Sequence, residues 1–248
     1  MAKDNEMKPI VESYNIGEEF LYSKSYLFIK GYATGLGLKY TLMALPLARK
    51  IHDGQYRFGC VQIDGKPHRL PYIVHCLKVC STLISLSLPL SSGELDLLLA
   101  SSILHDALEN SKDFFPQGGR ELVCIHGFPE AVFNTIQLLS KQSGASEHEL
   151  NEYFNNIKQD KIALLVKLAD RSHNVEDLYN MKIEKIHKYV KETRTWIYPL
   201  CAYGKANYPE LSNGLTILKN KIRSLTELTE TFIHRYEDGK HTESLQKK

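Results

Sequence analysis

The stretch SGELDLLLASSILHDAL, residues 92–108, decides the fold class of this chain. Its apolar residues recur at the three- and four-residue spacing of a buried helix, at Leu95, Leu98, Leu99 and Ile103. Ser91 or Ser92 can cap the start, and Glu94 in the first turn complements the positive end of the helix. We therefore expect a core helix here that ends in polar residues.

Helical periodicity also dominates the flanking segments. The expected helices cover residues 38–52, 72–86, 120–126, 129–141, 161–174, 183–206 and 211–236. Residues 161–174 could form a buried strand by periodicity alone, but their length and their neighbours favour a helix. Ser146 and Glu149 have capping-box spacing. Strand patterns are scarce outside residues 58–70, where we expect a long loop or small hairpin, so the predicted class is all-α.

Composition excludes several classes of protein. The chain has 248 residues and a formal net charge of +2, which is no footprint of a general nucleic-acid binder. No run approaches the ~18 apolar residues of a membrane span, and the start lacks the apolar core of a secretory signal. The five cysteines form no C-x-x-C pair, which is typical of a reducing compartment. We expect a cytoplasmic protein.

Polar residues interrupt three apolar helices. His105 and Asp106 end the helix quoted above, His75 follows an apolar helix start, and Asp170 ends the most hydrophobic run. The His105-Asp106 pair alone is equally consistent with an exposed helix end that has no role. Two imidazoles and two carboxylates from three helices, however, form a mixed nitrogen and oxygen set that suits Mn²⁺, Fe²⁺, Mg²⁺ or Zn²⁺.

Four motifs make the chain similar to a known family. They are His52-x-Gly54-Gln55-x-Arg57, Pro71-Tyr72-Ile73-x-His75, Leu104-His105-Asp106-x-x-Glu109-Asn110 and Lys167-Leu168-Ala169-Asp170-Arg171-x-His173-Asn174. In this order, and followed by Glu192-Thr193, they resemble the HD superfamily of metal-dependent phosphohydrolases. The resemblance is closest to the hydrolase domain of RelA/SpoT homologues, especially the small alarmone hydrolases, and covers about residues 38–206. It implies an HD-domain helical bundle.

The resemblance also implies an activity and a set of site residues. The activity is Mn²⁺-dependent removal of pyrophosphate from the 3′ position of ppGpp or pppGpp. The implied metal ligands are His75, His105, Asp106 and Asp170. Glu109 and its neighbour Asn110 would position or activate the attacking water. Arg57 would contact the substrate phosphates, where a guanidinium fork fits well, and Asn174 would help to hold the nucleoside.

The chain departs from the family pattern at two places. The water-activating pair is usually Glu-Asp, and here Asn110 follows Glu109; an asparagine can orient a water but cannot accept a proton. The interval between Arg57 and the Pro71 motif is also longer than usual. Arg69 or Lys66 in this interval could supplement Arg57 or change which base is accepted.

These departures keep two other functions open. One is an HD-type phosphohydrolase of another nucleotide, namely an adenine alarmone, NADPH or a pyrophosphorylated RNA end. The other is a nucleotide-binding module with weak catalysis. The resemblance also allows a cognate alarmone-synthetase toxin as a protein partner. We expect a helical extension over residues 1–35, the hydrolase domain over 36–237 and a flexible tail over 238–248, with no room for a synthetase domain.

Overall fold

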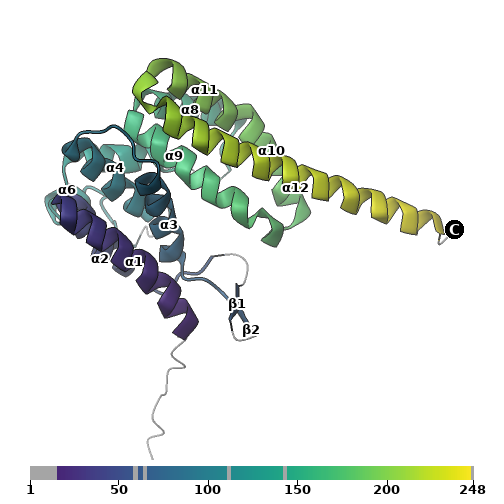
Figure 1. Cartoon of the computed structure of the whole chain (residues 1–248), viewed down its shortest axis with the longest axis horizontal. Helices are drawn as coiled ribbons and strands as arrows, with labels where there is room; N and C mark the ends of the chain where they lie inside the picture. Colours follow the sequence, from purple (N-terminus) through teal and green to yellow (C-terminus); the bar gives the residue numbers. More distant parts are fainter. Residues whose placement is uncertain (1–15, 58–60, 64–65, 111–112, 142–143, 247–248) are drawn as a thin grey trace, which may run out of the picture.

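The computed structural model describes residues 16–57, 61–63, 66–110, 113–141 and 144–246, and it confirms the all-α prediction (Figure 1). The α-helices are α1 Ile16–Leu36, α2 Lys39–Ile51, α3 Tyr72–Ser85, α4 Ser92–Leu104, α5 Ala107–Asn110, α6 Glu121–Cys124, α7 Glu130–Leu139, α8 Glu147–Gln159, α9 Lys161–Asn174, α10 Ile183–Glu192, α11 Tyr198–Asn207 and α12 Ser212–Gln246. Short 3₁₀ segments, η1 Val175–Asn180 and η3 Pro209–Leu211, and a π-helical segment, η2 Thr193–Ile197, connect the later helices.

Helices α3, α4 and α9 pack on one another at the centre of the bundle. Helix α9 is the most enclosed element, and its fully buried side chains are Ala163, Leu164, Leu165, Val166, Leu168, Ala169 and Ser172. Burial on all sides explains why its sequence reads as a continuous apolar run that a buried strand could also produce. The helix prediction for this run is confirmed, and the packing brings the ends of three core helices together.

The capping predictions are confirmed. Ser91 accepts a hydrogen bond from the Glu94 backbone N–H, and the Glu94 carboxylate accepts one from the Ser91 backbone N–H. Ser146 and Glu149 make the same reciprocal pair at the start of α8. Each capping box satisfies backbone donors that a helix start otherwise leaves without partners.

Two expected helices are interrupted. Helix α4 ends at Leu104, because His105 and Asp106 form a turn before α5 instead of continuing a helix to residue 108. The expected helix over residues 183–206 contains the π-helical segment η2. Pro199 follows this segment, lacks an N–H donor and clashes with a regular preceding turn, so a widened turn accommodates it.

The loop over residues 58–70 contains a small hairpin, which is one of the two structures expected there. Strands β1 Val61–Ile63 and β2 Lys66–His68 pair antiparallel, with Val61 opposite His68. Backbone hydrogen bonds hold the base of the loop, from the Arg57 N–H to the Leu70 carbonyl and from the Tyr72 N–H to the Gln55 carbonyl. The hairpin is therefore anchored directly before α3.

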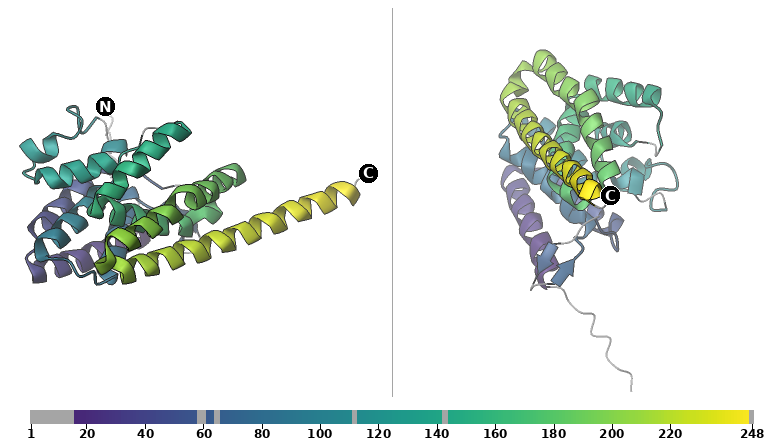
Figure 2. Two further views of the ribbon diagram at one scale, coloured as in Figure 1. Left: turned by 90° about the horizontal axis from the view of Figure 1, so that it is seen from above. Right: turned by 90° about the vertical axis from the view of Figure 1, so that its right-hand side faces the viewer.

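Helix α1 packs against α2 and α3 and contributes Tyr22, Ile29 and Ala33 to the main hydrophobic core. At the other end, α12 continues beyond the expected limit to Gln246 and projects from the bundle (Figures 1 and 2). The division at residues 35 and 237 stays a prediction. None of the helices in the described part of the chain is long and apolar enough to cross a membrane.

Candidate metal centre and substrate-side residues

The four side chains expected to bind metal converge where α3, α4 and α9 meet. His75 comes from α3, His105 and Asp106 from the turn after α4, and Asp170 from α9. The His75 Nε2 atom lies 3.2 Å from the Asp170 Oδ1 atom and 3.6 Å from the Asp106 Oδ2 atom. The His105 Nε2 atom lies 3.2 Å from Asp106 Oδ2 and 3.7 Å from Asp170 Oδ1. Both imidazoles therefore face both carboxylates.

Hydrogen bonds at the far side of each ring orient the two histidines. His105 Nδ1 lies 2.8 Å from the Ser102 carbonyl oxygen, which can only accept, so this nitrogen donates, and in the neutral ring Nε2 carries the lone pair. His75 Nδ1 lies 2.8 Å from His173 Nδ1. The Nε2 atoms of His75 and His105 are buried without a hydrogen-bond partner among the described residues. Burying polar atoms without partners is costly, so these two point to a ligand.

The charges of the cluster also fit a cation. Burial, with the nearby Arg57 charge, lowers the pKa of His75 to about 4, so this ring is neutral at physiological pH. Burial alone would lower the pKa of His105, but the Asp106 carboxylate beside it, with a smaller contribution from the Asp170 carboxylate, raises it well above its ordinary value. The cluster therefore attracts positive charge. Ligand atoms of His75, His105 and Asp106 all lie within 4.8 Å of one another, and a divalent cation suits this set.

Three further side chains hold the carboxylates in place. The Tyr72 hydroxyl donates to Asp106 Oδ2 at 2.6 Å. The Lys167 ammonium donates to Asp170 Oδ2 at 3.1 Å, and the Asn174 amide donates to Asp170 Oδ1 at 2.5 Å. Sequence reasoning gave no role to Tyr72 or Lys167. The available signal was their spacing, because each lies three residues before a ligand candidate and thus on the same helix face.

The expected substrate-side residues are only partly brought together. Arg57 donates to the Asn174 side-chain oxygen at 2.9 Å and pairs with Asp177 at 3.3 Å. Arg57 and Asn174 thus adjoin the cluster through Asp170. Arg69 is exposed and reaches the Arg57 carbonyl at 3.4 Å. Lys66 lies in β2, but its side chain is outside the part that the structure describes.

The two residues expected to act on water lie in α5. The Glu109 carboxylate accepts a hydrogen bond from the Lys141 backbone N–H. Glu109 reaches solvent, yet desolvation by surrounding protein, together with the nearby Asp106 charge, raises the pKa of its carboxyl. Asn110 follows in the same helix, and its side chain is outside the described part.

A second buried ion pair explains why Glu192 and Thr193 accompany the motifs. The Arg171 guanidinium pairs with the Glu192 carboxylate, and it lies 3.5 Å from the Thr193 hydroxyl. Lys141 also pairs with Glu192 at 3.3 Å. These contacts join the end of α10 to α9 at Arg171, the residue that follows Asp170. They support the position of α9 and add no group to the metal cluster.

Known proteins resemble this chain in sequence and fold, although no family model matches it. A GTP pyrophosphokinase from Myxococcus xanthus is 31% identical over 166 residues, 63% of this chain and 19% of that protein. The bifunctional (p)ppGpp synthase/hydrolase SpoT of Escherichia coli K12 is 25% identical over 189 residues, 73% of this chain and 24% of SpoT. The chain thus spans about a fifth to a quarter of these relatives.

A solved structure of a metazoan orthologue of SpoT, described as hydrolysing ppGpp, shares the fold. It covers 77% of this chain and 96% of that one, with a TM-score of 0.53 and 17% sequence identity. The sequence matches and this fold confirm the resemblance drawn from the four motifs. The chain is similar in sequence to RelA/SpoT proteins and shares the all-α fold of this SpoT orthologue.

Proposed function

We propose that this protein is a divalent-metal-dependent hydrolase that releases pyrophosphate from the 3′ position of ppGpp and pppGpp, with Mn²⁺ as its metal. The observation that carries the proposal is the pair of buried Nε2 atoms, on His75 and His105, that face two carboxylates and have no hydrogen-bond partner among the described residues. His75, His105, Asp106 and Asp170 would hold the metal.

A divalent cation held by these four residues would supply Lewis-acid activation of a phosphoryl group and of the attacking water. The protein's part is to keep the cluster in one geometry. Lys167 donates to the Asp170 oxygen that faces away from the histidines, and Tyr72 donates to the Asp106 oxygen that faces them. The Ser102 carbonyl orients the His105 ring by accepting from Nδ1. Such supporting contacts orient ligands and tune their basicity.

Glu109 is the group that we assign to proton transfer. Its raised pKa makes it a better base than an ordinary carboxylate, and its bond to the Lys141 N–H keeps the side chain in place. Asn110 would orient the water by hydrogen bonding and accept no proton. The proposal therefore requires that one carboxylate suffices where the family usually has two.

Arg57 is the phosphate-binding candidate. Its guanidinium lies beside the cluster, held by Asn174 and Asp177, and it can exchange the Asp177 contact for a phosphate oxygen. Asn174 bonds both Arg57 and Asp170, so substrate bound at Arg57 would be placed relative to the metal ligands.

The hydrolase assignment rests on the cluster, because the relatives carry names of both activities. One is a GTP pyrophosphokinase and another a synthase/hydrolase. The hairpin beside Arg57 leaves the accepted base open, so another nucleotide is the second candidate. A nucleotide-binding module with slow turnover is the third, supported only by Asn110. A cognate synthetase toxin stays a prediction.

The test is pyrophosphate release from ppGpp, pppGpp and their adenine analogues, and phosphate release from NADPH, all with Mn²⁺. The unmodified protein is compared with Asn110→Asp and with Asn156→Asp, a matched change at an exposed position of α8. Release from the guanine alarmones by the unmodified protein supports the proposal. If the unmodified protein releases nothing from these substrates and only Asn110→Asp does, the result would contradict the proposal and favour the binding module.

A further inference from the structure

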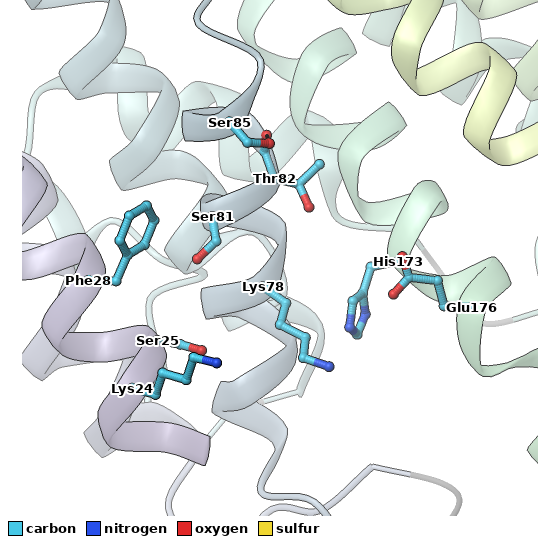
Figure 3. Close-up of a pocket in the computed structure, with 9 residues that line it drawn as sticks. All are labelled: Lys24, Ser25, Phe28, Lys78, Ser81, Thr82, Ser85, His173 and Glu176. Carbon is cyan, nitrogen blue, oxygen red and sulfur yellow. Dashed lines mark hydrogen bonds between the residues drawn. The ribbon is translucent and has the colours of Figure 1, made fainter. Parts of the chain in front are cut away.

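A groove lined in part by His173 lies beside the candidate metal cluster, and His173 contacts the Nδ1 side of the ligand candidate His75. The groove runs between α1 and α3 to the start of η1 and encloses about 400 Å³ (Figure 3). Lys24 and Ser25 line it from α1, Lys78 and Thr82 from α3, and His173 closes its end. Its volume falls in the range of small-molecule sites.

His173 is the buried polar group that faces this groove. The side chain is 5% exposed, and its Nε2 atom has no hydrogen-bond partner among the described residues. Its Nδ1 atom is engaged with His75 Nδ1 at 2.8 Å. Figure 3 shows the Lys78 side chain extending toward the His173 ring. A buried donor or acceptor without a partner is costly, so a ligand here would remove that cost.

The charges that line the groove are predominantly positive. Lys24 and Lys78 are exposed, and neither has a carboxylate within ion-pair distance in the described part of the chain. Glu176 at the rim is already paired with Lys221 at 2.5 Å. The hydroxyls of Ser25 and Thr82 add neutral donors. Two ammonium groups and neutral donors in one groove match an anion with several oxygens.

We propose that this groove binds the phosphate group of a small molecule, with Lys24 and Lys78 as counter-charges and the His173 Nε2–H as a buried donor. The phosphate would lie between α1 and the His173 end of α9. Phe28, which is 51% exposed at the rim, would contact the rest of the molecule. This phosphate site shares no residue with the four metal-ligand candidates, and His173 lies between the two sites.

The His75–His173 hydrogen bond would couple the two sites, an extension that rests on the proposed function. For His75 Nε2 to bind metal through its lone pair, His75 Nδ1 must carry the proton and donate to His173 Nδ1. The neutral His173 then carries its proton on Nε2, facing the groove. Metal in the cluster and phosphate in the groove therefore favour the same tautomers.

The test follows the His173 ring directly. Full-length protein with ¹⁵N-labelled histidine is titrated with inorganic phosphate, and with acetate as a carboxylate comparator, at constant ionic strength in Mg²⁺. We expect phosphate to shift the His173 Nε2 resonance, which is assigned by its loss in His173→Gln. The apparent dissociation constant should rise roughly tenfold or more in Lys24→Ala/Lys78→Ala and in Lys78→Glu. Lys30→Ala, an exposed change on α1, is the control.

Three results would overturn the site: no phosphate-dependent shift of His173, an equal shift with acetate, or wild-type phosphate affinity in both lysine variants. Alarmone hydrolysis is measured separately on the same samples. Loss of the His173 response with hydrolysis intact contradicts this inference alone, whereas an intact response without any hydrolysis contradicts the proposed function alone.

Discussion

The buried metal-ligand cluster and the surface beside it place polar groups in two different ways. We call this surface, which carries Arg57 and Arg69, the rim. The cluster histidines are almost inaccessible, with His75 1% and His105 3% exposed, and tyrosine, lysine and backbone partners hold the cluster. On the rim, Arg57 lies directly before the 58–70 loop and contacts Asn174 and Asp177, and Arg69 lies near the end of that loop and reaches only the Arg57 carbonyl and the Tyr56 ring among the described residues. The cost of burial requires the cluster to be organised before any ligand arrives, whereas the rim can adjust to the ligand.

This difference predicts unequal effects of substitution. Changes within the cluster should abolish metal binding, changes in the buried pairs that support it should lower stability, and changes on the rim should alter substrate affinity. Four variants test this order, from the largest expected effect to the smallest.

Asp106→Ala should remove both metal binding and hydrolysis. The lost carboxylate lies 3.2 Å from His105 Nε2 and 3.6 Å from His75 Nε2, so the cation loses charge and geometry together. We expect activity to fall by at least about a thousandfold. Mn²⁺ titration and pyrophosphate release measure the two losses, with Asp113→Ala as an exposed control. An active, metal-free Asp106→Ala protein would refute the site.

Glu192→Gln should destabilise the fold by about 3 kcal/mol at pH 7, because it leaves Arg171 buried without its partner. Burial alone would raise the pKa of Glu192, but the Arg171 guanidinium, aided by Lys141, lowers it below 4.5. The ionised pair therefore stabilises the protein above pH 4.5, and this stabilisation is lost as the pH falls through the folded-state pKa.

Urea unfolding at pH 7 and at progressively lower pH measures this dependence. The difference between the wild type and Glu192→Gln should shrink in acid. Glu230→Gln is the matched control, since its pair with Arg194 is exposed and should contribute less than about 1 kcal/mol. If both variants lose the same free energy of unfolding, the buried pair contributes no more than the exposed one and the prediction is wrong.

Arg57→Lys should raise the KM for the alarmone roughly tenfold with a smaller change in kcat, because lysine keeps the charge but loses the guanidinium fork. Steady-state kinetics at saturating Mn²⁺ separate the two constants. A fall in kcat at unchanged KM would instead place Arg57 at the reacting group.

Arg69→Ala should have the smallest effect, with KM changing less than about threefold. Its side chain is exposed and contacts the Arg57 carbonyl and the Tyr56 ring. The same kinetic assay measures it beside Arg57→Lys. A tenfold or larger effect would show that the rim extends to Arg69 and that the hairpin helps to select the substrate.

The sequence predicted the elements that burial constrains most. His75 and Asp170 are polar residues in apolar helices, and that costly placement distinguishes them from their neighbours in the amino-acid sequence itself. The helix over residues 161–174 and the two capping boxes followed from periodicity and short-range spacing, which depend little on the rest of the fold.

Contacts between distant segments could not be predicted in the same way. The bond from Tyr72 to Asp106, the pair of His75 with His173 and the groove beside α1 depend on how α1, α3 and α9 pack. Periodicity also failed to predict the break after Leu104 and the π-helical turn before Pro199, because side-chain contacts and a missing N–H override it there.

Anomalous scattering from crystals grown with Mn²⁺ would locate the metal on this chain. A single peak within bonding distance of the Nε2 atoms of His75 and His105 and of carboxylate oxygens of Asp106 and Asp170 is the predicted result. A manganese peak elsewhere on the chain, with the cluster lacking metal at saturating Mn²⁺, would contradict the account.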